Sequence, residues 1–148
     1  MMCLIALLIK DEFPDADMDK VMNMCIIHDL GEAFTGDIPT FEKTSDNEVT
    51  EDNLLKNWIN SFPAGQSEEI LELFNEMNER KTEEAKIYKA IDSLEALIQH
   101  NISDISTWIP LEYDLNMHYA DDKVAFSDYL SALREEIRKD TIAKINNC

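Results

Sequence analysis

Apolar residues recur at the three- and four-residue intervals of amphipathic helices over most of this chain. The longest such stretch begins at Thr82, where acidic residues occupy the expected first turn, and continues to about Ser103. Only three glycines and four prolines occur in 148 residues, which disfavours a turn-rich β-sheet fold. Further helices are expected over about 18–30, 54–62, 67–80 and 122–145. The segment 43–51 is expected to be a polar connection, and the segment 105–116 is expected to be irregular. The sequence therefore predicts one all-α domain over residues 1–148, folded as a helical bundle.

The overall charge limits the partners of this chain. Its formal net charge of −18 repels nucleic-acid backbones and anionic lipids, so we expect neither nucleic acid nor membrane as a partner. The apolar opening segment, Met1 to Ile9, is too short to span a bilayer and is expected to belong to a buried helix. The three cysteines form no Cys-x-x-Cys pair, which favours the reducing cytoplasm. Among them, Cys25 is expected to be a small buried apolar residue.

A histidine and several carboxylates cluster at the end of the helix predicted over 18–30. Both His28 and Asp29 can reach one cation near a helix end, and Glu32 lies one turn later. Imidazole and carboxylate groups suit a divalent metal and proton transfer, so Glu32 is a candidate general acid or base. The alternative is a helix-terminal histidine beside an exposed aspartate. Asp37 follows in a loop, where it is either functional or simply a turn residue.

Asp92 is the second acidic residue of interest, because it lies within a strongly apolar helix. A carboxylate in such surroundings needs a partner. One interpretation is a metal ligand supplied by a helix distant in sequence. The alternative is an ordinary solvated or salt-bridged aspartate, with Lys89, Lys86 or Ser93 as its partner. Two further residues are candidates for substrate contact: Lys43 for a phosphate and Trp108 for a base, although core packing is favoured for Trp108.

At His28-Asp29 the chain resembles the HD-domain phosphohydrolases, a family named for that metal-binding pair. The longer run His28-Asp29-x-x-Glu32-x-x-Thr35-Gly36-Asp37-x-Pro39-Thr40 is similar to the 5′-deoxynucleotidase branch of this family. The segment from Ala85 to Glu95 is similar to the family helix that carries the last metal-ligand aspartate. The resemblance extends over nearly the whole chain.

The resemblance implies a site and a reaction. It implies that a divalent ion (Mn, Co, Mg, Fe or Zn) is held by His28, Asp29 and Asp92. It assigns Glu32 to acid/base catalysis and Asp37 to assisting proton transfer or placing the water. Thr35, Pro39 and Lys43 are expected to bind the substrate. The implied reaction is hydrolysis of (deoxy)nucleoside 5′-monophosphates, with the metal offsetting the phosphate charge in an acidic protein. A homodimer is also expected.

The chain departs from the family pattern at one ligand. The family site uses a further histidine, in a Glu-His-Ser-like segment on the preceding helix, and this segment would fall before Met1. We therefore expect an HD domain truncated at its N-terminus. The alternative function is a catalytically impaired HD-like helical protein that binds metal, nucleotide or a protein partner. An acidic all-α interaction protein without a small-molecule site is a third reading, based on composition alone.

Overall fold

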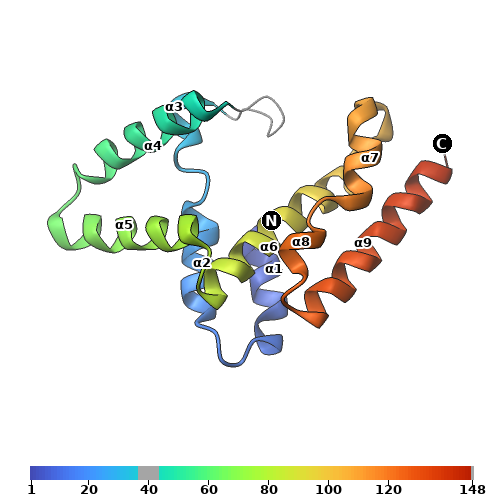
Figure 1. Ribbon diagram of the computed structural model, residues 1–148, viewed down its shortest axis with the longest axis horizontal. Helices are drawn as coiled ribbons and strands as arrows, with labels where there is room; N and C mark the ends of the chain where they lie inside the picture. The colour runs from blue at the N-terminus through green and yellow to red at the C-terminus, as the bar shows by residue number, and fades with distance from the viewer. Residues whose placement is uncertain (37–43, 148) are drawn as a thin grey trace.

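The computed structural model describes residues 1–36 and 44–147, and every regular element in these ranges is a helix (Figure 1). This confirms the predicted all-α fold. The elements in chain order are α1 (Met2–Ile9), η1 (Lys10–Glu12), α2 (Met18–Ile27), α3 (Glu32–Thr35), α4 (Ser45–Ile59), α5 (Ala64–Glu79), α6 (Glu83–Ile102), η2 (Ile105–Thr107), α7 (Pro110–His118), α8 (Asp121–Val124) and α9 (Asp128–Asn146). None of the helices in the described ranges is long and apolar enough to cross a bilayer.

Helix α6 is the central element of the fold. Its start is fixed by Thr82, whose side-chain oxygen accepts a hydrogen bond from the backbone N–H of Ala85 at 3.2 Å. The helix packs against α1, α2, α5, α8 and α9, so side chains on several of its faces are buried. Ile87, Ile91 and Leu94 are fully buried. Figure 1 shows α6 crossing the middle of the molecule, with the α4–α5 hairpin at one end and α7 at the other.

Helix α2 brings the histidine-containing turn against α6. The helix begins at the cap residue Asp17, whose carboxylate accepts a hydrogen bond from the backbone N–H of Lys20 at 3.0 Å. Val21, Met24 and Cys25 form its buried face, as the apolar stripe predicts. The helix ends at Ile27 rather than near residue 30. The following residues therefore form a turn, and α3 starts immediately afterwards.

Two predictions about irregular segments are wrong. The supposed connection 43–51 is helical from Ser45 onward, because Thr44 and Asn47 form a reciprocal capping box at the start of α4. The region 105–116 contains η2 and α7, and Pro110 lies in the first turn of α7. Proline is well tolerated there because that N–H needs no partner within the helix.

The other helix boundaries agree more closely with expectation. Helix α5 starts at Ala64, three residues before the predicted start. The predicted final helix is divided into α8 and α9, because Ser127 caps a new helix by accepting a hydrogen bond from the N–H of Leu130 at 3.3 Å. Trp108 is 7% exposed, which confirms its predicted burial.

Candidate active site at the contact between α2 and α6

His28 lies in the turn that follows α2, and both of its ring nitrogens have partners. Nδ1 donates a hydrogen bond to the carbonyl oxygen of Cys25 at 2.8 Å, and Nε2 is 2.7 Å from Oδ2 of Asp29. A backbone carbonyl on one nitrogen fixes the ring orientation and directs the other nitrogen outward, as is common for metal-binding histidines. The local fold therefore presents Nε2 and a carboxylate oxygen side by side.

The electrostatic environment of His28 includes Asp92 as well as Asp29. Burial lowers the pKa of His28, but the hydrogen bond and charge of Asp29 and the charge of Asp92 raise it, and the net shift is upward. The imidazole therefore holds a proton more firmly than a free histidine does. Although Asp92 is distant in sequence, the contact between α2 and α6 brings it within electrostatic reach of His28.

Asp92 is partly buried on α6 and forms the ion pair that its sequence context suggested. Its Oδ2 accepts a hydrogen bond from Nζ of Lys89 at 2.5 Å, one turn earlier in the helix. The ring of Tyr88 meets the ring of His28 edge to face, with the centroids 6.3 Å apart. Burial, followed by the charges of Asp92 and Asp29, raises the pKa of the Tyr88 phenol, which therefore stays protonated.

The predicted metal ligands thus lie in one region, but each of them already has a side-chain partner. Within residues 1–36 and 44–147, no three His, Cys, Asp or Glu side chains are grouped closely enough to hold a metal as they stand. Asp29 is paired with His28, and Asp92 with Lys89. The set His28, Asp29 and Asp92 therefore stays a prediction.

The other predicted site residues follow in α3 and after it. Glu32 opens α3, and its partly buried side chain is engaged with a neighbouring group. The hydroxyl of Thr35 donates to the carbonyl oxygen of Gly36 at 3.3 Å. Asp37, Pro39 and Lys43 lie outside the described residues, so their predicted roles remain expectations.

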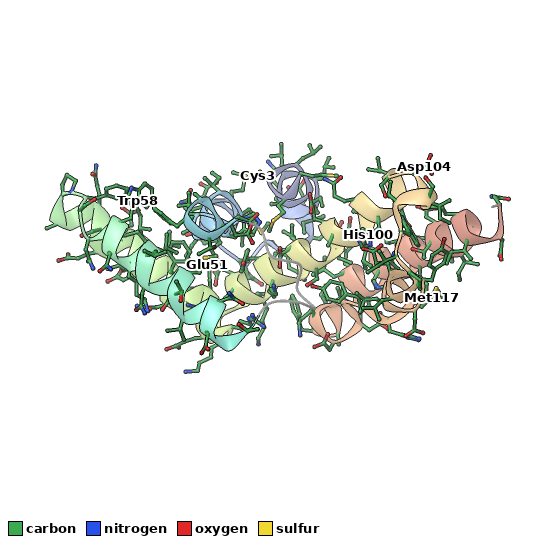
Figure 2. All side chains as sticks on the ribbon, turned by 90° about the horizontal axis from the view of Figure 1, so that it is seen from above. Cys3, Glu51, Trp58, His100, Asp104 and Met117 are labelled. Atoms are coloured by element: carbon green, nitrogen blue, oxygen red, sulfur yellow. The ribbon has the colours of Figure 1, made fainter. Side chains whose placement is uncertain are left out.

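A cleft of about 450 Å³ opens beside His28, between α2, α4, α5 and α6. Its lining residues are His28, Val49, Glu51, Asp52, Leu55, Phe74, Met77, Asn78, Arg80 and Tyr88. Figure 2 shows Glu51 on α4, on the side of that helix that faces the rest of the molecule. A Cβ on Gly31 would be 2.7 Å from Oε1 of Glu51, so the glycine allows this carboxylate to approach the turn after His28. The cleft combines polar groups with an apolar wall, as ligand sites commonly do.

Sequence reasoning missed three residues of this cleft. Tyr88 was detectable in principle, because it lies one helical turn before Asp92 on the same face. Glu51 lies in the segment that was predicted to be a connection. Arg80 was treated only as the end of a helix, and no local signal indicates that it lines the cleft beside His28.

A second hollow, of about 390 Å³, also reaches His28 and Asp29, and α1 contributes to it with Cys3 (Figure 2). Cys25 lies on its wall, and burial raises the pKa of this thiol to about 12. The thiol is therefore protonated and unreactive near neutral pH, which agrees with its predicted role as a buried apolar residue.

Comparison with known proteins identifies relatives of this chain. The HD domain matches residues 1–134. The 5′-deoxynucleotidase HDDC2 of Dictyostelium discoideum is 26% identical over 129 residues, which cover 86% of this chain and 63% of that protein. The protein of the same name from Bos taurus is 28% identical over 100 residues, covering 66% of this chain and 48% of the relative. The 5′-deoxynucleotidase hdd1 of Schizosaccharomyces pombe is 30% identical over 92 residues, which cover 58% of this chain and 46% of that protein.

The chain therefore spans between 46% and 63% of the length of these three relatives. No solved structure matches it significantly.

Proposed function

The chain belongs to the HD-domain family, and on this premise we propose that it is a metal-dependent phosphohydrolase acting on (deoxy)nucleoside 5′-monophosphates. The observation that carries the proposal is the arrangement of His28, which is oriented by a backbone carbonyl and directs Nε2 toward Asp29 under the influence of Asp92. The names of the relatives, 5′-deoxynucleotidases, support the substrate class.

The chemistry of the donor set fits a divalent ion. Imidazole nitrogen and carboxylate oxygen suit Mn, Co, Fe and Zn, and the carboxylates also suit Mg. We assign the ligands as His28, Asp29 and Asp92. An ion would compete with a proton for Nε2 and with Lys89 for the Asp92 oxygen, so its affinity should rise with pH over the range in which His28 loses its proton.

The residues of the chain divide the proposed reaction between them. When bound, a divalent ion supplies Lewis acidity and positive charge toward a phosphate group. Glu32 would take the proton of the water molecule that attacks phosphorus and return it to the leaving nucleoside oxygen. Asp37 would assist that proton transfer. Thr35, Pro39 and Lys43 would contact the substrate.

Phosphate release from dAMP, dGMP, dTMP and AMP, each with Mn²⁺, Co²⁺ or Mg²⁺, tests this function. We expect Glu32→Gln to lower kcat by about 10²–10⁴-fold, the usual contribution of a general acid or base. Glu68→Gln is a matched control, because Glu68 is an exposed residue on α5. Absence of phosphate release from every nucleotide with every ion would refute the proposal.

Metal content tests the ligand assignment separately. We expect His28→Ala and Asp92→Ala to lower the amount of metal that copurifies or binds on titration. Glu68→Gln should leave it unchanged. If neither ligand variant alters metal binding, the assigned site is wrong, whatever the activity of the chain.

The alternative function is a catalytically impaired HD-like protein that binds metal, nucleotide or a partner. One observation favours it: in this conformation Asp92 is already paired with the ammonium group of Lys89. It predicts that wild-type chain binds metal or nucleotide without releasing phosphate, and that Glu32→Gln leaves this binding intact.

Two further properties complete the proposal. We propose a homodimer, supported by the exposed apolar side chains of Leu4, Leu7 and Leu8 on α1. Sedimentation of wild type and Leu8→Glu tests this, since a charge on the shared face should yield monomer. We also propose a cytoplasmic location, which the free thiols of Cys3 and Cys25 support.

A further inference from the structure

Arg80 is the one lysine or arginine among the described residues that line the cleft beside His28. It directly follows α5, where its backbone N–H donates to the carbonyl oxygen of Glu76 at 3.0 Å. Its φ of 53° and ψ of 33° lie in the left-handed region. Glycine is the usual residue at such a helix end, because it avoids the steric cost of a Cβ. The backbone alone therefore gives no reason for an arginine here.

The charge of Arg80 is not neutralised by a carboxylate among the described residues, whereas the charges of the neighbouring Lys56 and Lys89 are. Lys56 is paired with Asp52 at 2.6 Å, and Lys89 with Asp92. Within the described residues, the guanidinium of Arg80 has neither a salt bridge nor a side-chain hydrogen bond. Its electrostatic influence reaches the phenol of Tyr88, whose ring contacts that of His28. Arg80 and His28 both line the same cleft.

The rest of the cleft offers surroundings suited to an organic ligand. The side chains of Leu55, Phe74 and Met77 are buried along one part of the wall, and Asn78 adds an amide. The volume of about 450 Å³ lies within the range of small-molecule sites. A nucleoside can therefore contact these apolar side chains while its charged group lies beside Arg80.

We propose that Arg80 binds the phosphate group of a nucleoside 5′-monophosphate, between α5 and His28, with the nucleoside against the apolar wall of the cleft. This inference rests on the proposed function and deepens it, because it assigns a phosphate-binding residue within the described chain. A guanidinium suits this task, since its planar N–H groups match two phosphate oxygens at once. Arg80 is thus a specificity residue that distinguishes a nucleotide from a nucleoside.

The left-handed backbone of Arg80 allows an unusually clean test. Arg80→Gly removes the charge while relieving the strained conformation, so the fold should be at least as stable as wild type. Arg80→Lys keeps the charge but loses the two-point contact. Lys81→Ala is the matched control, because Lys81 is adjacent, exposed and paired only with Glu79 among the described residues.

The measurement is calorimetric titration of each variant with dAMP and with deoxyadenosine, with and without Mn²⁺. We expect Arg80→Gly to weaken dAMP binding by about ten- to a hundredfold, the value of a charged hydrogen-bonded pair, and to change deoxyadenosine binding less than twofold. Arg80→Lys should lie between wild type and Arg80→Gly. In turnover assays KM should rise by a similar factor, with a smaller change in kcat.

The possible results separate this inference from the proposed function. Equal dAMP affinity in Arg80→Gly and Lys81→Ala would overturn the role of Arg80 even if wild type hydrolyses dAMP. Equal losses for dAMP and deoxyadenosine would also overturn it, since they indicate a change of cleft shape. Arg80-dependent dAMP binding without release of phosphate from any of the four nucleotides would refute hydrolysis and support the binding role. If wild type binds neither dAMP nor deoxyadenosine, the role of Arg80 is overturned, whereas the proposed function is still decided by phosphate release from the four nucleotides.

Discussion

Replacing Gly31 by alanine would place a methyl group 2.7 Å from both Cγ and Oε1 of Glu51, closer than carbon and oxygen atoms can approach without moving. The backbone itself does not oppose the change, because Gly31 has φ −63° and ψ −37°, which suit any residue. Alanine should even gain about 0.4–1 kcal/mol through the lower entropy of the unfolded chain. The effect of the substitution therefore depends on the side chain of Glu51.

The overlapping atoms belong to the distal part of a partly exposed, flexible side chain, so Glu51 can relieve the overlap by leaving its rotamer, at a cost of about 0.5–1.5 kcal/mol. We expect Gly31→Ala alone to lower the free energy of unfolding by about 0.5 kcal/mol or less, the balance of these two terms. In a Glu51→Ala background the same change should be stabilising. Their coupling in a double-mutant cycle should then be about 0.5–1.5 kcal/mol.

Urea unfolding, followed by tryptophan fluorescence and circular dichroism, measures each corner of the cycle. Gly65→Ala is the control, because a Cβ on Gly65 meets nothing within 4 Å and the residue lies in the first turn of α5. That variant should be stabilised by about 0.4–1 kcal/mol. A coupling indistinguishable from zero, or a Gly31→Ala variant as stable as Gly65→Ala, would refute the claimed approach of Glu51 to the turn.

Three further predictions concern the stability of the helices. The backbone N–H of Asp17 donates a hydrogen bond to Glu84, and this is the main cause that lowers the pKa of Glu84 below 4.5. The ionised Glu84 side chain therefore stabilises the fold above that pH, and this stabilisation is lost on acidification through the folded-state pKa. Glu84→Gln should reduce this acid sensitivity, as measured by urea midpoints at a series of pH values. Leu94→Ala should cost about 2–5 kcal/mol in urea unfolding, because Leu94 is fully buried, whereas Ile102→Ala, at a residue 68% exposed, should stay within about 0.5 kcal/mol. Ser127→Ala should lower the thermal midpoint through a loss of about 1 kcal/mol at the start of α9, and an unchanged midpoint would contradict the cap.

Much of the helical architecture could be predicted from local sequence signals. The cap at Thr82 and the apolar period that follows it define α6, because both act within a few residues. The same signals were misread at two places. The capping box at Thr44 starts a helix whose apolar residues come mostly later. The segment 105–116 was predicted to be irregular, although its Pro110 is compatible with the first turn of a helix.

Some residues of the candidate site could likewise be grouped from the sequence, whereas others are brought together only by the tertiary structure. His28, Asp29 and Glu32 are close in sequence, so their neighbourhood follows from one turn between α2 and α3. The influence of Asp92 on His28 depends instead on the packing of α2 against α6. Glu51 and Arg80 reach the same cleft only because α4 and α5 fold back as a hairpin beside α6. Apolar periodicity and capping residues specify each helix separately. Which charged side chains from four helices meet at one site depends on how the buried faces of those helices pack together.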